Sequence, residues 1–343
     1  MSLHLHLLRI AVLLAGIGIL AARAEDKPKP PATKPPSEAE LRAVITKGLG
    51  FLAKDGEAWM EQKDCNSCHH LPEMLWSHRE AKLRGFEIDQ AKFDEWLGWA
   101  DKRAKDKGPG LEMLAFMKLA MPERAAPELT KLIVDGQKPD GSWNPAGQFT
   151  AQKRGNPDAQ ATSTRIFLLA LATPDAAAPE AEAARTKAAA FLAKKDAPGS
   201  PGSLESLVVR MIYARSTGST ADADALRGQI LKQQRGDGGW SFITGENISD
   251  VHATGEALYA LQPSASEPAA AEAIARAQQW LVKTQREDGS WASDFTRISK
   301  GDRSAPSKAK SAKDAERIYV YFASGWAVIG LLQFVPVQAE SKK

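Results

Sequence analysis

The residues with the most distinctive chemistry lie at positions 65–70 (Cys-Asn-Ser-Cys-His-His), a stretch that contains both cysteines of the 343-residue chain. Two thiols three positions apart, followed directly by a histidine, form the attachment pattern of c-type haem. The thiols form thioethers with the two vinyl groups, and the histidine ligates the iron. The pattern therefore predicts one covalent haem c per chain, held by Cys65 and Cys68, with His69 as the proximal iron ligand.

Other chemistry fits the same residues less completely. In an oxidising compartment Cys65 and Cys68 could form a local disulfide. Together with His69 or His70 and a remote ligand they could hold zinc, although a well-spaced second ligand pair is missing. An inert thiol pair is the remaining alternative.

The distal side of the iron has no obvious ligand in the sequence. Met113 and Met117 share one face of an expected helix, and His252 is a further candidate. Core packing is the expected role of both methionines, and a five-coordinate iron is the alternative to all three ligands.

The N-terminus predicts export, which haem c attachment generally requires. Residues 10–20 form an apolar run too short to span a bilayer, and Ala22-Arg23-Ala24 follows as a cleavage pattern. Residues 1–24 are therefore expected to be a signal peptide, with an uncleaved membrane anchor as the alternative. Residues 25–37, rich in proline and lysine, are expected to be an extended linker. The mature protein is expected in the periplasm or another extracytoplasmic compartment, without a membrane span.

The charge balance excludes one class of partner. The chain has 45 basic and 42 acidic residues and a net charge of only +3, so we expect no nucleic-acid binding. A redox partner protein is the remaining candidate, and the sequence leaves the oligomeric state open.

Helices are expected to position these residues. Ser37 and Glu40 form a capping box that starts the first helix, and alanine-rich segments with three- and four-residue apolar spacing recur after it. Residues 323–326 are expected to open the last of these helices, and the basic run at 299–313 is expected to be a solvated loop.

An internal repeat organises the helices. The pattern Q-x-x-D-G-[SG]-W occurs at 137–143, 234–240 and 285–291. Its Asp-Gly pair supplies the positive φ that ends a helix sharply, so each unit is interpreted as an outer helix, a turn and an inner helix. The three tryptophans should occupy equivalent places, and each glutamine amide should bond to backbone at a neighbouring helix terminus.

This repeat resembles the QW motif of terpenoid cyclases and protein prenyltransferases. The resemblance covers about residues 38–338 and implies a single all-α domain, an α/α toroid of about six helix hairpins around a central cavity, followed by a tail at 339–343. A linear α-solenoid is the structural alternative. The segment from Cys65 to Phe86 also resembles exported bacterial squalene-cyclase-like proteins that carry a haem c motif in the first toroid hairpin.

The family's catalytic residues are not found in this chain. The D-x-D-D motif that protonates the alkene in squalene-hopene cyclases is absent, so we expect no squalene or terpene cyclase activity. The zinc site of the prenyltransferases cannot be assembled either, because both cysteines lie early in the chain. Asp158 and Asp250 are expected to stand singly at helix starts, and Asp250 and His252 are the residual catalytic candidates.

These observations favour electron transfer or redox sensing by a haem protein that uses the toroid as a scaffold. Two alternatives remain. The first is a periplasmic enzyme or binding protein for an apolar, terpenoid-like substrate in the central cavity. The second is a structural or interaction module without haem.

Overall fold

The computed structural model describes residues 33–63, 70–106, 110–145, 154–173, 178–195, 202–293 and 306–338, with side chains except at 103–106 and 306–315. The expected signal peptide, most of the linker, the haem-attachment residues Cys65, Cys68 and His69, and the tail at 339–343 lie outside the described residues. Contacts divide the chain into two units, Met1–Ala32 and Thr33–Lys343, and the second contains every described helix. None of the helices in these ranges combines the length and apolar character that crossing a bilayer requires.

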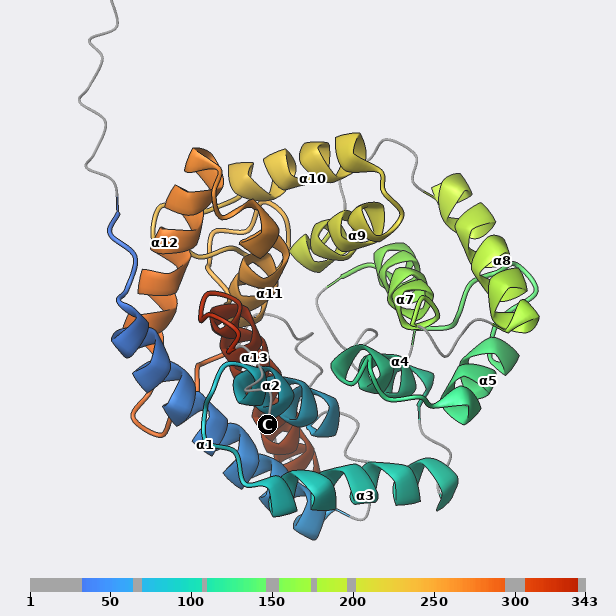
Figure 1. Cartoon of the computed structure of the whole chain (residues 1–343), viewed down its shortest axis with the longest axis horizontal. Coiled ribbons are helices and arrows are strands. Elements are labelled where there is room, and N and C mark those ends of the chain that lie inside the picture. Colours follow the sequence, from blue (N-terminus) through green and yellow to red (C-terminus); the bar gives the residue numbers. More distant parts are fainter. Residues whose placement is uncertain are drawn as a thin grey trace, which may run out of the picture. The chain divides into compact units, whose positions relative to one another are not determined.

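The helices of the second unit alternate between an outer and an inner position (Figure 1). The outer helices are α1 (Glu38–Gln62), α3 (Gln90–Asp106), α5 (Pro127–Asp135), α8 (Pro179–Lys195), α10 (Thr220–Lys232) and α12 (Pro268–Thr284). The inner helices are α2 (Leu71–Leu83), α4 (Leu111–Ala120), α7 (Asn156–Ala170), α9 (Leu204–Ser216), α11 (Val251–Leu261) and α13 (Pro306–Leu332). A short 3₁₀ turn, Gln262–Ser264, follows α11.

The inner helices form a closed ring. Each contacts the next in the order α2, α4, α7, α9, α11, α13, and α13 returns to contact α2. In the outer layer the last helix also meets the first, because α12 contacts α1. This arrangement is the expected α/α toroid, and the linear solenoid is wrong because the last helices pack against the first.

Outer helices bury one face, whereas inner helices are buried around most of their surface, and their sequences differ accordingly. The outer helix α10 buries only Ala223, Leu226 and Ile230, which lie on one face. The inner helix α11 is buried along nearly its whole surface, because it packs against α9, α12 and α13. An amphipathic stripe therefore suffices for an outer helix, whereas an inner helix must be apolar around most of its circumference.

The first helix begins where the sequence predicts. Ser37 N–H donates to the Glu40 carboxylate at 2.8 Å, and Glu40 N–H donates to Ser37 Oγ at 3.3 Å, so the capping box is confirmed. The preceding residues are also held in place. Thr33 N–H donates to the Glu272 carboxylate at 3.2 Å, and Gln279 Nε2 donates to the Lys34 carbonyl at 3.1 Å. The end of the expected linker therefore lies against α12.

The three repeat tryptophans occupy equivalent places, as predicted. Each is fully buried, and its indole Nε1 donates to the carbonyl of the residue ten positions earlier, near the end of the preceding outer helix. The distances are 2.8 Å for Trp143, 2.7 Å for Trp240 and 2.9 Å for Trp291. Each indole thereby satisfies a carbonyl in the last turn of its own outer helix.

The repeat glutamines join neighbouring outer helices. Their amides donate to the turn glycine's carbonyl and to a carbonyl of the next outer helix: Gln137 to Ala184 at 2.8 Å, Gln234 to Ala273 at 2.7 Å, and Gln285 to Val44 at 2.9 Å. The accepting residue lies in the second turn of the helix rather than at its terminus, as the sequence had suggested. The reason is that the turn packs against the side of the neighbouring helix.

Each repeat turn requires glycine for two reasons, a positive φ and a close approach to the neighbouring helix. Gly141, Gly238 and Gly289 have φ values of 90°, 103° and 88°. A Cβ added to these glycines would lie 2.3, 2.6 and 2.2 Å, respectively, from a backbone carbonyl oxygen of the next outer helix. Only glycine permits both the conformation and the close approach.

One inner helix differs from its predicted bounds. Residues 323–326 lie inside α13 rather than at its start, and the described part of the basic run, 306–313, is helical rather than a loop. The repeat match is nevertheless correct in position. Ser324 Oγ accepts a hydrogen bond from Trp291 N–H at 3.0 Å, as Thr254 Oγ1 does from Trp240 N–H at 3.0 Å. The last inner helix therefore has extra turns before the equivalent residue.

Gly289→Ala should destabilise the protein more than Gly218→Ala. Gly218 also has positive φ (76°) but no atom within 4 Å of an added Cβ, so its replacement should cost only the conformational strain, about 1–2 kcal/mol. At Gly289 the new Cβ would also displace the Lys47 carbonyl, adding about 1–3 kcal/mol. Urea denaturation of both variants measures the difference, and equal losses would contradict the role of the glycine at the ring closure.

Candidate functional site

Two described residues flank the C-x-x-C-H segment. On one side, Lys63 N–H donates to the Trp59 carbonyl at 3.0 Å and ends α1. On the other side, His70 is the N-cap residue of α2, and its carbonyl accepts from Met74 N–H at 2.9 Å. The backbone is therefore fixed by a helix end immediately before and immediately after the segment.

His70 is enclosed by aromatic side chains. Its ring is fully buried, stacks on Trp59 at 4.4 Å and lies tilted against Tyr321 at 4.0 Å between ring centroids. Nε2 lies 3.4 Å from Asp55 Oδ2, and Arg317 in turn pairs with Asp55 at 2.8 Å. Burial lowers the pKa of His70 below its ordinary value, opposed by the Asp55 carboxylate. The imidazole of His70 therefore links the start of α2 to α1 and α13 through packing contacts.

A buried carboxylic acid lies one turn after His70. Glu73, in the first turn of α2, is 3% exposed, and burial raises its pKa to about 8. It lies against α13, since a Cβ on Gly325 would be 3.0 Å from Glu73 Cβ. Glu73 is therefore a neutral acid near pH 7, a role that sequence reasoning missed because nothing local marks the first turn of α2 as buried.

The methionines considered as distal iron ligands lie in α4. Met113 and Met117 are 2% and 5% exposed and belong to the main hydrophobic core, together with Met60, Leu75 and Trp96. Packing contacts of this kind are what the sequence favours for both residues. The third candidate, His252, lies in a different environment.

His252 belongs to a buried polar cluster formed where α7, α9 and α11 begin. Asp250 is the N-cap residue of α11, and its Oδ1 accepts from Ala253 N–H at 2.9 Å. His252 follows in the first turn, packed beside the rings of Phe242 and Phe322 at centroid distances of 5.7 and 6.1 Å. The N-cap role expected for Asp250 is thus confirmed.

Asp158 reaches the same cluster from α7. It is the third residue of that helix rather than its cap, and it accepts a hydrogen bond from Ser203 Oγ at 2.7 Å. Arg154, just before α7, lies 3.7 Å from Asp158 and also pairs with Glu205 of α9. The expectation that Asp158 and Asp250 stand singly is therefore wrong, because adjacent inner helices begin side by side and bring their first turns together.

Two glutamates complete the cluster. Glu205 and Glu256 are 3% and 1% exposed, and Nε2 of His252, itself 2% exposed, lies 3.1 Å from Glu256 Oε1. Burial raises the pKa of Glu205 to about 7, opposed by Arg154, and raises the pKa of Glu256 well above its ordinary value. Burial also lowers the pKa of His252. The low polarity of the site thus disfavours every isolated charge.

Sequence reasoning missed both glutamates, although one had a local signal. Glu256 follows His252 by four residues inside an otherwise apolar helix, a spacing that places both on one face. Glu205 had no comparable signal, since an acidic residue in a first turn is ordinary N-terminal charge placement.

Aromatic residues from three inner helices meet beside this cluster. Trp76 of α2, Tyr259 of α11 and Trp326 of α13 have ring centroids 5.6–6.0 Å apart. Trp326 also stacks on His252 at 6.1 Å. A cluster of packed aromatic rings therefore lies next to the buried acids.

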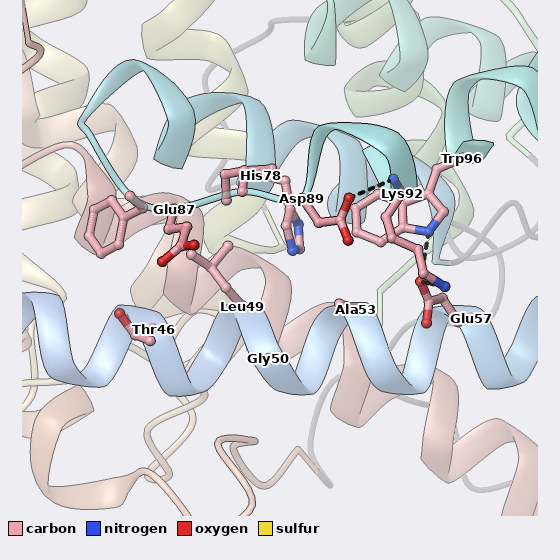
Figure 2. A pocket seen from close by; sticks show the side chains of 12 residues that line it. Thr46, Leu49, Gly50, Ala53, Glu57, His78, Glu87, Asp89, Lys92 and Trp96 are labelled. Carbon is pink, nitrogen blue, oxygen red and sulfur yellow. Dashed lines mark hydrogen bonds and ion pairs between the residues drawn. The ribbon is translucent and has the colours of Figure 1, made fainter. Parts of the chain in front are cut away.

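A pocket of about 600 Å³ lies elsewhere, between α1, α2 and the start of α3 (Figure 2). Glu57 spans part of it, pairing with Lys92 at 3.0 Å and accepting from Trp96 Nε1 at 3.2 Å. His78 also lines it, with Nδ1 2.8 Å from the Met74 carbonyl and a pKa lowered to about 4 by burial. None of the lining residues comes from α7, α9 or α11, so this is not the central cavity that the sequence predicts.

Comparison with known proteins identifies the fold. Neither a family model nor a curated protein matches the sequence. A possible GH105 family member from Salmonella enterica matches with a TM-score of 0.57 and 12% identity over 88% of this chain and 94% of that one. A type II terpene cyclase from Scytonema, in complex with merosterolic acid A, has a TM-score of 0.54 and 16% identity over 88% of this chain and 98% of that one. At these identities the likeness shows an α/α toroid fold and nothing finer.

Replacing Glu73 should change how stability depends on pH. The folded-state pKa of about 8 lies above the ordinary glutamate pKa of 4.5, so the folded protein holds a proton that the unfolded chain releases. The wild-type free energy of unfolding should therefore fall relative to Glu73→Gln as pH rises from about 5 to 8, by about 1.4 kcal/mol per pH unit. Urea denaturation at several pH values tests this, and a pH-independent difference would refute the raised pKa.

Proposed function

We propose that this protein binds one haem c covalently through Cys65 and Cys68, with His69 as the proximal iron ligand, and that it transfers single electrons or senses redox state. The observation that carries the proposal is the donor set. The only two thiols of the chain and an adjacent histidine fall within the link between α1 and α2, in the spacing that haem c attachment needs.

The described residues beside this link fit such a group. Trp59, Leu71 and Tyr321 are buried and apolar or aromatic, as the surroundings of a haem must be. His70 is already committed to its stack between Trp59 and Tyr321, which supports His69 rather than His70 as the iron ligand.

The chain's own residues would then have three tasks. Cys65 and Cys68 would hold the group, and His69 would ligate its iron. The fixed ends at Lys63 and His70 would restrict the link between α1 and α2. When bound, a haem supplies the one-electron Fe(III)/Fe(II) couple, whose potential depends on ligands, burial and nearby charge.

Export and a redox partner belong to the same proposal. The apolar run and cleavage pattern in residues 1–24 would send the chain to the compartment where haem c is attached. An electron-transfer or sensing role there would require a partner protein to supply or receive the electron.

The double variant Cys65→Ala, Cys68→Ala should carry no covalent haem, because no other thiol exists in the chain. Purified wild-type protein, expressed with haem c maturation and export, should show a Soret band and a c-type pyridine haemochrome that survive denaturation. A colourless wild-type protein with a correctly processed signal peptide would overturn the proposal.

His69→Ala and His70→Ala should have separate effects. His69→Ala should permit some attachment but change the iron spectrum, since it removes the proximal nitrogen. His70→Ala should leave the spectrum unchanged but lower the free energy of unfolding by about 2 kcal/mol, because it empties the space between Trp59 and Tyr321. Absorbance spectra and urea denaturation measure both. A spectrum altered only by His70→Ala would mean that the ligand assignment is wrong.

A further inference from the structure

We propose that Glu205, His252 and Glu256 bind one divalent transition-metal ion where the inner helices α9 and α11 begin. This site is separate from that of the proposed haem. One ligand atom from each of the three side chains lies within 4.8 Å of the other two. Two of the residues come from α11 and the third from α9, so the site is formed only when these inner helices pack together.

The geometry is near to that of a metal centre. His252 and Glu256 are one helical turn apart on the same face of α11. The 3.1 Å between His252 Nε2 and Glu256 Oε1 suits two ligands on one ion, since ligand bonds of about 2.0–2.2 Å place neighbouring ligand atoms about 3–3.5 Å apart. Glu205 would complete the set by a small side-chain rotation.

The imidazole of His252 supplies the second, independent observation. It is 2% exposed. Within the described part of the chain Nδ1 has no hydrogen-bond partner, and Nε2 lies 3.1 Å from Glu256 Oε1. Buried polar atoms almost always have partners. A cation between the imidazole and the two carboxylates would be bound by one ring nitrogen of His252 and by a carboxylate oxygen from each glutamate.

The charges around the site favour a cation. Four carboxylates converge here, those of Asp158, Glu205, Asp250 and Glu256, with Arg154 as the positive group facing them. Arg154 pairs with Glu205 and lies 3.7 Å from Asp158 and 5.5 Å from the centre of the Phe242 ring. Tyr319 is a further titratable group near Arg154. Four carboxyl groups therefore face one guanidinium, and a divalent ion would neutralise the carboxylates that ligate it.

The donor set selects the class of ion. One imidazole nitrogen and two carboxylate oxygens, with no thiolate among them, suit Mn²⁺, Fe²⁺ or Zn²⁺ rather than a soft ion. An all-oxygen set would be expected for Ca²⁺ or Mg²⁺. Mn²⁺ is therefore a suitable probe, and its preference for oxygen and imidazole ligands over thiolates separates this site from the cysteine segment.

The test is Mn²⁺ binding to the exported full-length protein after chelator treatment, followed by electron paramagnetic resonance. We expect one Mn²⁺ per chain, with nitrogen-14 modulation from a single imidazole in the spin-echo envelope, and a higher thermal midpoint with Mn²⁺ present. His252→Gln should abolish the modulation, and His252→Gln and Glu256→Gln should each raise the Kd at least about tenfold. Glu73→Gln is the matched control, a buried first-turn acid of another inner helix, and should leave the Kd unchanged.

Two results would overturn the proposal: no stoichiometric Mn²⁺ binding by the wild-type protein, or binding that persists unchanged in both cluster variants. If a variant fails to fold, as circular dichroism would show, the wild-type nitrogen modulation decides, and its absence counts against the site. The haem proposal can fail separately. A colourless protein that binds Mn²⁺ with imidazole modulation would reject the haem and retain the metal site.

Discussion

Closure of the ring is the constraint on which the rest of the structure depends. The contact is made between the last repeat turn and the first helix. Gln285 donates to the Val44 carbonyl at 2.9 Å, and Gly289 lies so close to Lys47 that no Cβ could fit between them. The same two contacts join α5 to α8 and α10 to α12. Since a helix pair cannot bury its apolar inner helix alone, each inner helix in the described part of the chain has an inner neighbour on both sides only when the last pair meets the first.

The packing of successive inner helices explains why charged groups are buried where these helices begin. Because α7, α9 and α11 begin side by side, the polar groups of their first turns face one another: Arg154, Asp158, Glu205, Asp250 and His252. Water is largely excluded from this end, so each charge must be neutralised by a partner, a proton or a bound ion. Burial raises the pKa values of Glu205 and Glu256 and lowers that of His252 because it disfavours the charged form of each group.

The helix α13 connects this cluster with the surroundings of the cysteine segment. Tyr321 packs against His70, next to that segment, while the neighbouring Phe322 packs against His252 of the cluster. Trp326 then lies between α2 and α11, in contact with Trp76 and Tyr259. His70, next to the cysteine segment, and His252 of the cluster therefore contact adjacent residues of one helix. The fold that brings them there is shared with glycosidase-family and terpene-cyclase structures.

The sequence by itself determined the local features: the start of α1 at its capping box, the sharp turns at Asp-Gly, the equivalent burial of the three tryptophans, and the all-α repeat that implied a toroid. These depend on residues within one helix or one turn, whose spacing the sequence shows directly. Only the tertiary structure decided which side chains meet across helices, such as Asp158 with Ser203, or Glu205 with His252 and Glu256. It also decided that His70 is buried between α1 and α13. The physical reason is that helical periodicity fixes the face on which a residue lies, whereas the packing of neighbouring helices, set by ring closure, fixes what that face contacts.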